Sequence, residues 1–225
     1  MEQHSRPRVH VPERRPLITA LAAAGIAGPV IFAVVALALG LLRSGCSFVA
    51  DPVVKLVAGP SGWVQHVSFV VLGSFMIAYA IGLHLSVRPT RWGVLGPALL
   101  VLSGIGPVVA GVTSPISPHF LITFLGAGIG LIVISRRMVP DPRWHSLAAY
   151  SLTTGIAILA VIPTHSVLAL PPGTPLHPWW GLLNYLAITL WLACTVVLAL
   201  RSLRIARTAD GSQTVSGLVL GPLGR

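Results

Sequence analysis

The basic residues of this chain alternate with six long apolar stretches in a regular order. Every Lys and Arg except Arg43 and Lys55 lies before the first stretch, between the second and third, between the fourth and fifth, or after the sixth. Successive membrane-crossing helices bring these segments to one side, and an excess of Lys and Arg marks the cytoplasmic side. The order therefore predicts a multi-pass membrane protein with both termini in the cytoplasm.

The six stretches have the lengths of membrane-spanning helices, which need about 20 mostly apolar residues to cross about 30 Å of hydrocarbon. The predicted spans are 17–42, 63–87, 92–112, 119–135, 145–162 and 179–200. Uninterrupted apolar runs exclude the alternating strands of a membrane barrel. The sequence thus predicts an all-α integral membrane bundle of six transmembrane helices. A basic cytoplasmic tail at 1–16 precedes the transmembrane domain at 17–204, and a flexible cytoplasmic tail follows at 205–225.

The composition excludes a nucleic-acid surface in spite of the formal charge of +10. Hydrophobic residues make up 54% of the chain and charged residues 9%, against about 25% charged in an average soluble domain. We expect the Arg residues in the short turns to contact the negatively charged inner leaflet. No soluble domain is predicted, so we expect no nucleic acid and no soluble partner.

The predicted spans contain no charged side chain, because all five acidic residues lie in loops or tails. Ion-coupled carriers generally place an ionisable group at membrane depth, so this pattern disfavours them. Pro107 lies in the third span and predicts a kink, or else a broken helix that lines a substrate site. On the second interpretation, the ligand-pocket candidates are Ser103, Pro107 and Asn184. Gly126 and Gly130 form a close-approach motif, which we interpret as packing within the bundle rather than dimerisation.

Histidine is the residue type most suited to chemistry in this chain. The catalytic candidates fall near the outer ends of the spans, and they are His66, His119, His165, His177 and Asp51. Together they are able to bind zinc or to act as acid and base in a hydrolase. However, no pair has the H-x-x-x-H spacing of a metal site, and interfacial histidines also serve as amphipathic anchors. We therefore predict no metal site, no haem and no other cofactor.

Several short segments resemble a bacterial membrane-protein family known as domain of unknown function 998. They are Gly28-Pro29, 51–56, 62–65, Phe69, Gly73, Gly82-Leu83, the Gly104 and Gly106 region, His119, 175–179 and 181–183. The resemblance implies a six-helix bundle in the bacterial inner membrane, with an activity that is not established. The family pattern has a Ser where this chain has Val54, and an Asp after the third span, where this chain has 113–115. Both differences remove groups that an enzyme needs beside His119, so the chain resembles a diverged member.

The resulting prediction is a binding or accessory membrane protein. Its expected partners are membrane lipids or another membrane protein. A metal-dependent membrane hydrolase that uses the outer histidines is the first alternative, and a small-molecule transporter is the second.

Overall fold

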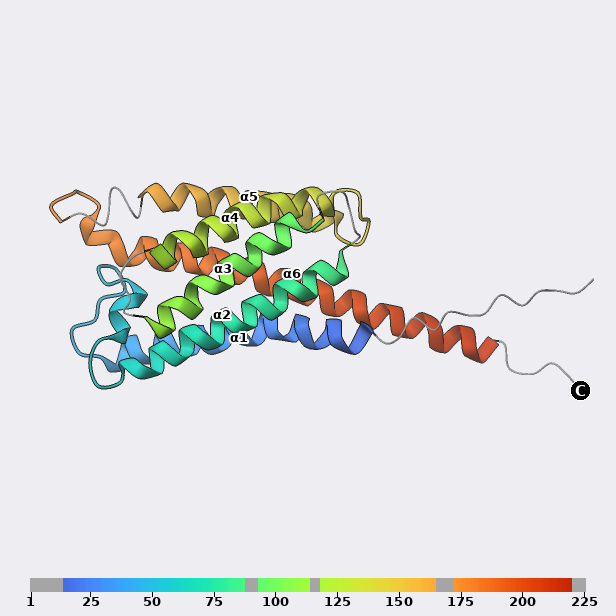
Figure 1. Cartoon of the computed structure of the whole chain (residues 1–225), viewed down its shortest axis with the longest axis horizontal. Coiled ribbons are helices and arrows are strands. Elements are labelled where there is room, and N and C mark those ends of the chain that lie inside the picture. Colours follow the sequence, from blue (N-terminus) through green and yellow to red (C-terminus); the bar gives the residue numbers. More distant parts are fainter. Residues whose placement is uncertain (1–13, 88–92, 114–117, 165–171, 220–225) are drawn as a thin grey trace, which may run out of the picture.

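The computed structural model describes residues 14–87, 93–113, 118–164 and 172–219. Six α-helices cross the molecule side by side (Figure 1). They are α1 (Arg14–Leu42), α2 (Gly62–Ser86), α3 (Leu95–Val112), α4 (Pro118–Met138), α5 (His145–Pro163) and α6 (Trp180–Val219). The short 3₁₀ helices η1 (Val53–Val57) and η3 (His177–Trp179) lie before α2 and α6. Within the described ranges every regular element is a helix, which confirms the predicted all-α class.

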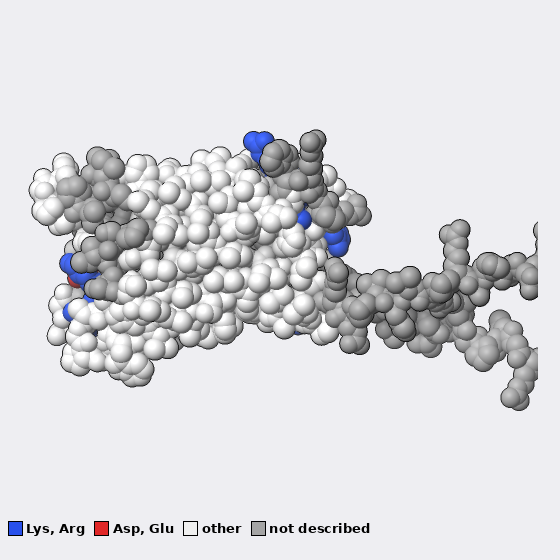
Figure 2. Space-filling model, viewed as in Figure 1, with Lys and Arg blue, Asp and Glu red and all other residues white. Residues whose placement is uncertain are grey.

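All six helices are long and apolar enough to span a membrane. Figure 2 shows a broad uncharged band along the bundle, with charged atoms only near its two ends on the face in view. Since a helix satisfies its own backbone hydrogen bonds, it is stable in such a band without water. The protein is therefore a multi-pass membrane protein.

The helices form a closed ring in which each contacts its neighbours in sequence and α6 returns to contact α1. The residues 43–62 lie at one end of the bundle, which we call the plug end. Arg137 and Arg143 lie at the opposite end, which we call the arginine end. The beginning of α1 and the end of α6 both lie at the arginine end (Figure 1).

Glycines allow the helices from α2 to α5 to approach closely. A Cβ atom at Gly104 of α3 would lie 2.9 Å from the Gly73 carbonyl oxygen of α2. Gly126 and Gly130 of α4 face α3, whereas Gly128 between them faces α5. The close-approach motif therefore packs helices within one chain, as predicted. Small residues favour such contacts because membrane helices associate through packing, without a hydrophobic driving force.

The structure differs from the sequence prediction at two places. First, α6 continues as helix to Val219, through most of the segment 205–225 for which a flexible tail is predicted. Extending an existing helix costs far less than starting one, and no proline interrupts this segment before Pro222.

The second difference concerns Arg137, which we expected to contact lipid headgroups. Its side chain is buried, with 3% of its surface exposed, and donates to the carbonyl oxygens of Gly93 and Val87. Close by, the buried Asp141 carboxylate accepts two hydrogen bonds from the Arg143 guanidinium, at 3.0 and 2.8 Å. At the arginine end, buried polar contacts thus connect the ends of the helices to the loops between them. These contacts form only when the loops are folded.

Candidate functional site

The plug end of the bundle is closed by a compact loop, residues 51–58, which we call the η1 plug. Its apolar side chains Pro52, Val53 and Leu56 are buried. Arg43, directly after α1, holds the plug because its Nη1 atom donates to the carbonyl oxygens of Lys55 and Ala58, at 2.6 and 3.1 Å.

The other side of the η1 plug docks on α6. The Val53 N–H donates to the buried Asn184 Oδ1 at 3.1 Å, and the Leu182 N–H donates to the Val49 carbonyl oxygen at 2.9 Å. A Cβ atom at Gly181 would lie 2.6 Å from the Asp51 backbone nitrogen, so only glycine allows this approach. Two segments far apart in sequence, 49–53 and 181–184, therefore form one unit.

Asp51 and Lys55 form an ion pair on the exposed side of the plug, with 2.6 Å between Oδ1 and Nζ. The hydrogen bond from Lys55, together with one from the Ser47 backbone N–H, holds the pKa of the Asp51 carboxyl below its ordinary value. The charge of Arg43 acts in the same direction. Lys55 Nζ also lies 5.8 Å from the centre of the Trp180 ring, a cation–π distance.

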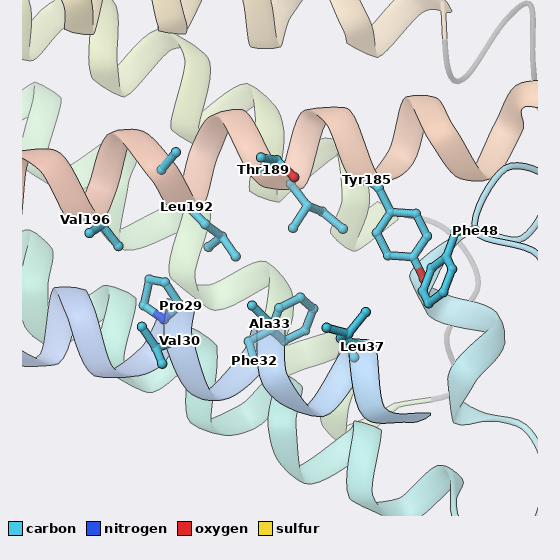
Figure 3. A pocket seen from close by; sticks show the side chains of 13 residues that line it. Pro29, Val30, Phe32, Ala33, Leu37, Phe48, Tyr185, Thr189, Leu192 and Val196 are labelled. Carbon is cyan, nitrogen blue, oxygen red and sulfur yellow. The ribbon is translucent and has the colours of Figure 1, made fainter. Parts of the chain in front are cut away.

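Below the plug, an apolar groove of about 400 Å³ runs between α1 and α6. Figure 3 shows Pro29 and Val196 toward one end of the groove and Phe48 and Tyr185 at the other. The rings of Phe48 and Tyr185 meet edge to face, with 5.5 Å between their centres. Ala33 of α1 and Ala193 of α6 are exposed small residues on the groove walls, and leave room between the two helices.

Two hydroxyl groups belong to residues that line this groove, those of Thr189 and Tyr185. The Tyr185 hydroxyl is buried and has no hydrogen-bond partner among the described residues. Buried hydroxyl groups in proteins are nearly always hydrogen-bonded. This atom is therefore a buried hydrogen-bonding group without a partner, on a residue that lines the groove.

The predicted ligand-pocket residues lie elsewhere. Ser103 and Pro107 are buried in α3, where the Ser103 hydroxyl donates to the Leu100 carbonyl oxygen of its own helix at 2.8 Å. The helix is continuous at Pro107. Asn184 anchors the η1 plug, and α3 makes no contact with α6 in the described part of the chain. The structure therefore does not bring Ser103 and Pro107 together with Asn184.

The structure places the described catalytic candidates on different elements. His66 of α2 and His119 of α4 lie on opposite neighbours of α3, and His66 Nδ1 is 3.2 Å from the Gly111 carbonyl oxygen. His177 stacks on Trp180, and the Trp180 ring also faces Lys55, which pairs with Asp51. His165 lies outside the described residues. Among the described residues, no three His, Cys, Asp or Glu side chains form a group that could hold a metal ion.

Reasoning from sequence missed the groove and the role of Tyr185. A weak signal exists in the small residues Ala33, Ala36 and Ala193, whose short side chains leave space between the adjacent faces of α1 and α6. That signal is informative only once α1 and α6 are known to be neighbours. These two helices are the first and last of the chain.

Comparison with known proteins agrees with the resemblance in the sequence. Searches of curated proteins and of solved structures found no matching protein. A family model described as Protein of unknown function (DUF998) matches residues 26–201, which cover both walls of the groove and the η1 plug. The chain therefore belongs to the DUF998 family of proteins of unknown function.

Proposed function

We propose that this protein binds a membrane lipid, with an acyl chain in the groove between α1 and α6. The observation that carries the proposal is the apolar groove, which ends at an unpartnered tyrosine hydroxyl. The alternation of basic residues supports an orientation with both termini in the cytoplasm, and the family resemblance supports a bacterial inner membrane, so the groove would open in the outer leaflet.

The size and lining of the groove suit an acyl chain. Small-molecule sites commonly have volumes of about 300–1,000 Å³ and mostly apolar walls, and the volume of about 400 Å³ lies in this range. From Pro29 to Leu37 the wall on α1 extends about 12 Å along the helix. This is nearly half of a hydrocarbon core of about 30 Å, as expected for a chain confined to one leaflet.

Tyr185 supports a lipid with a polar junction between its chain and its headgroup. Its hydroxyl lies at the plug end of the groove, where it would donate a hydrogen bond to an ester carbonyl oxygen of a bound lipid. No contact among the described residues supports the hydrolase alternative or the transporter alternative. The histidines are distributed over separate helices, and Ser103 and Pro107 pack within the bundle.

A variant that fills the groove tests the proposal. Ala33 lines the groove and is exposed, whereas Ala38 is equally an exposed alanine of α1 but does not line it. We expect Ala33→Trp to lose the lipid that co-purifies with the full chain in mild detergent, as measured by native mass spectrometry. Ala38→Trp is the matched control and should retain the lipid.

Equal lipid content in the two variants would overturn the proposal. So would an Ala33→Trp variant that keeps its lipid but loses an oligomer or a membrane-protein partner, because the groove would then be a protein interface.

A further inference from the structure

The two basic residues outside the charge alternation, Arg43 and Lys55, lie together at the plug end. Both side chains are exposed. Asp51 is the nearest described acidic residue and pairs with Lys55, so the cluster of Arg43, Lys55 and Asp51 has a net charge of +1. The plug end is the end at which the alternation leaves few basic residues. A positive cluster there needs an explanation.

Arg43 continues the wall of the groove. Ala33, Leu37, Gly40 and Arg43 follow one another at spacings of three or four residues, which places them on one face of a helix. The Arg43 N–H still donates to the Leu39 carbonyl oxygen, so the helical path continues to this residue. The Phe48 ring packs directly on Gly40 and also lines the groove. Arg43 therefore lies beyond the plug end of the groove, about 9 Å along the helical path from Leu37, the last residue of α1 that lines it.

The guanidinium group of Arg43 is fixed on one side only. Its Nη1 atom donates to two carbonyl oxygens of the η1 plug, and these bonds orient the whole planar group. The Nε and Nη2 atoms have no partner among the described residues. These two atoms form the fork that binds phosphate oxygens in a bidentate manner.

The position of the basic residues along the bundle axis matches the order of chemical groups in a phospholipid. Lys55 lies over Trp180, which precedes Tyr185 by five residues of sequence, or about 7.5 Å if measured along a helix. The order from the centre of the bundle outward is apolar groove, tyrosine hydroxyl, then basic cluster. A phospholipid has the same order of acyl chain, ester and phosphate.

We infer that Arg43, with Lys55 beside it, binds the phosphate of a phospholipid headgroup whose acyl chain occupies the groove. The inference rests on the proposed lipid site and names its ligand class. The protein selects lipids that carry a phosphate over uncharged lipids with the same chains. Arg43 thereby has two roles, because one edge of its guanidinium holds the plug and the other edge binds the ligand.

The test compares phosphatidylglycerol with a diacylglycerol of identical chains. Both are titrated into the delipidated full chain in detergent, and binding is followed by native mass spectrometry. We expect phosphatidylglycerol to bind about tenfold more tightly, as a charge-assisted hydrogen bond to phosphate allows. Arg43→Gln should remove this preference, and Arg204→Gln, at an exposed arginine of the opposite end, should keep it.

Because Arg43 also anchors the plug, Lys55→Gln is a second variant, and it should weaken the preference while Arg43 still holds the plug. Equal affinities for the two lipids in the unmodified chain would overturn the inference and leave the groove proposal intact. Binding of neither lipid would overturn the groove proposal itself. Displacement of phosphatidylglycerol by inorganic phosphate alone would show a site for free phosphate, and would overturn the lipid assignment.

Discussion

Gln65 is a buried polar side chain in unfavourable surroundings. It is completely buried, and neither its amide oxygen nor its amide nitrogen has a hydrogen-bond partner among the described residues. Ser68, one turn further along α2, is buried with an unpartnered hydroxyl. Gly62, one turn earlier, packs on Val57, so this face of α2 lies beneath the η1 plug. Unpaired polar groups in an apolar interior reduce stability.

Replacing Gln65 with leucine tests this cost. We expect Gln65→Leu to raise the free energy of unfolding by about 1 kcal/mol, because an unpaired amide is exchanged for an apolar side chain of similar size. Denaturant unfolding of the purified protein in detergent measures the change. Gln65→Asn is the matched control and should not stabilise, since it retains an amide and leaves a void. A loss of stability in Gln65→Leu would mean that the amide has a partner in the membrane.

At the scale of elements, the η1 plug explains why distant segments of the sequence belong together. The segment 51–56 supplies the buried apolar side chains, Gly62 allows α2 to begin directly against Val57, and 181–184 supplies the surface on which the plug docks. The segments 51–56 and 181–183 are among those that carry the family resemblance. In the described structure these segments hold the plug on α6 through packing and hydrogen bonds, and 51–56 also carries the ion pair of Asp51 and Lys55. Val54, which stands where the family pattern has a Ser, is part of the 3₁₀ helix η1.

The contact between Asn184 and Val53 is the buried hydrogen bond that joins plug and α6. We expect Asn184→Leu to loosen the plug, because the buried Val53 N–H would lose its acceptor at a cost of about 1–3 kcal/mol. Hydrogen exchange followed by mass spectrometry should show faster exchange across 51–58. Thr189→Val also removes a polar atom from α6, but in the exposed groove, and should leave this exchange unchanged. Unaltered exchange in Asn184→Leu would show that apolar packing alone holds the plug.

The whole molecule is a ring of six helices whose closure brings the first and last helices together. The glycine-lined contacts from α2 to α5 are close, whereas α1 and α6 leave a groove. The ring also separates two polar ends, with the η1 plug at one and the buried Arg137 and Asp141 at the other. The proposed lipid site at the seam of α1 and α6 would be accessible from the membrane without opening the bundle.

The orientation of this ring in the membrane is a prediction for the whole molecule. In a chain without Cys46 and Cys194, Ser61→Cys at the plug end should react with a membrane-impermeant maleimide in intact cells. Pro142→Cys at the arginine end should react only after the membrane is permeabilised. Both positions are exposed, so accessibility differs only by side. The reverse pattern would contradict the orientation that the basic residues predict.

The sequence by itself determined the number of spans, their approximate limits and the helical class. These properties depend on local hydrophobicity and on the cost of unpaired backbone groups in lipid. It also indicated the GxxxG packing of α4 and, through short segments, the family. It predicted neither the buried state of Arg137 nor the continuation of α6.

Only the tertiary structure decided which helices are neighbours, and with them the groove, the plug and the separation of the histidines. Lipid chains are as apolar as leucine, so the apolar pattern of a span does not reveal which of its faces is covered by protein. Asn184 illustrates this limit, because the sequence marks it as a polar residue in a span but cannot show that its partner is Val53. The role proposed for the Tyr185 hydroxyl likewise depends on the position of α6 beside α1.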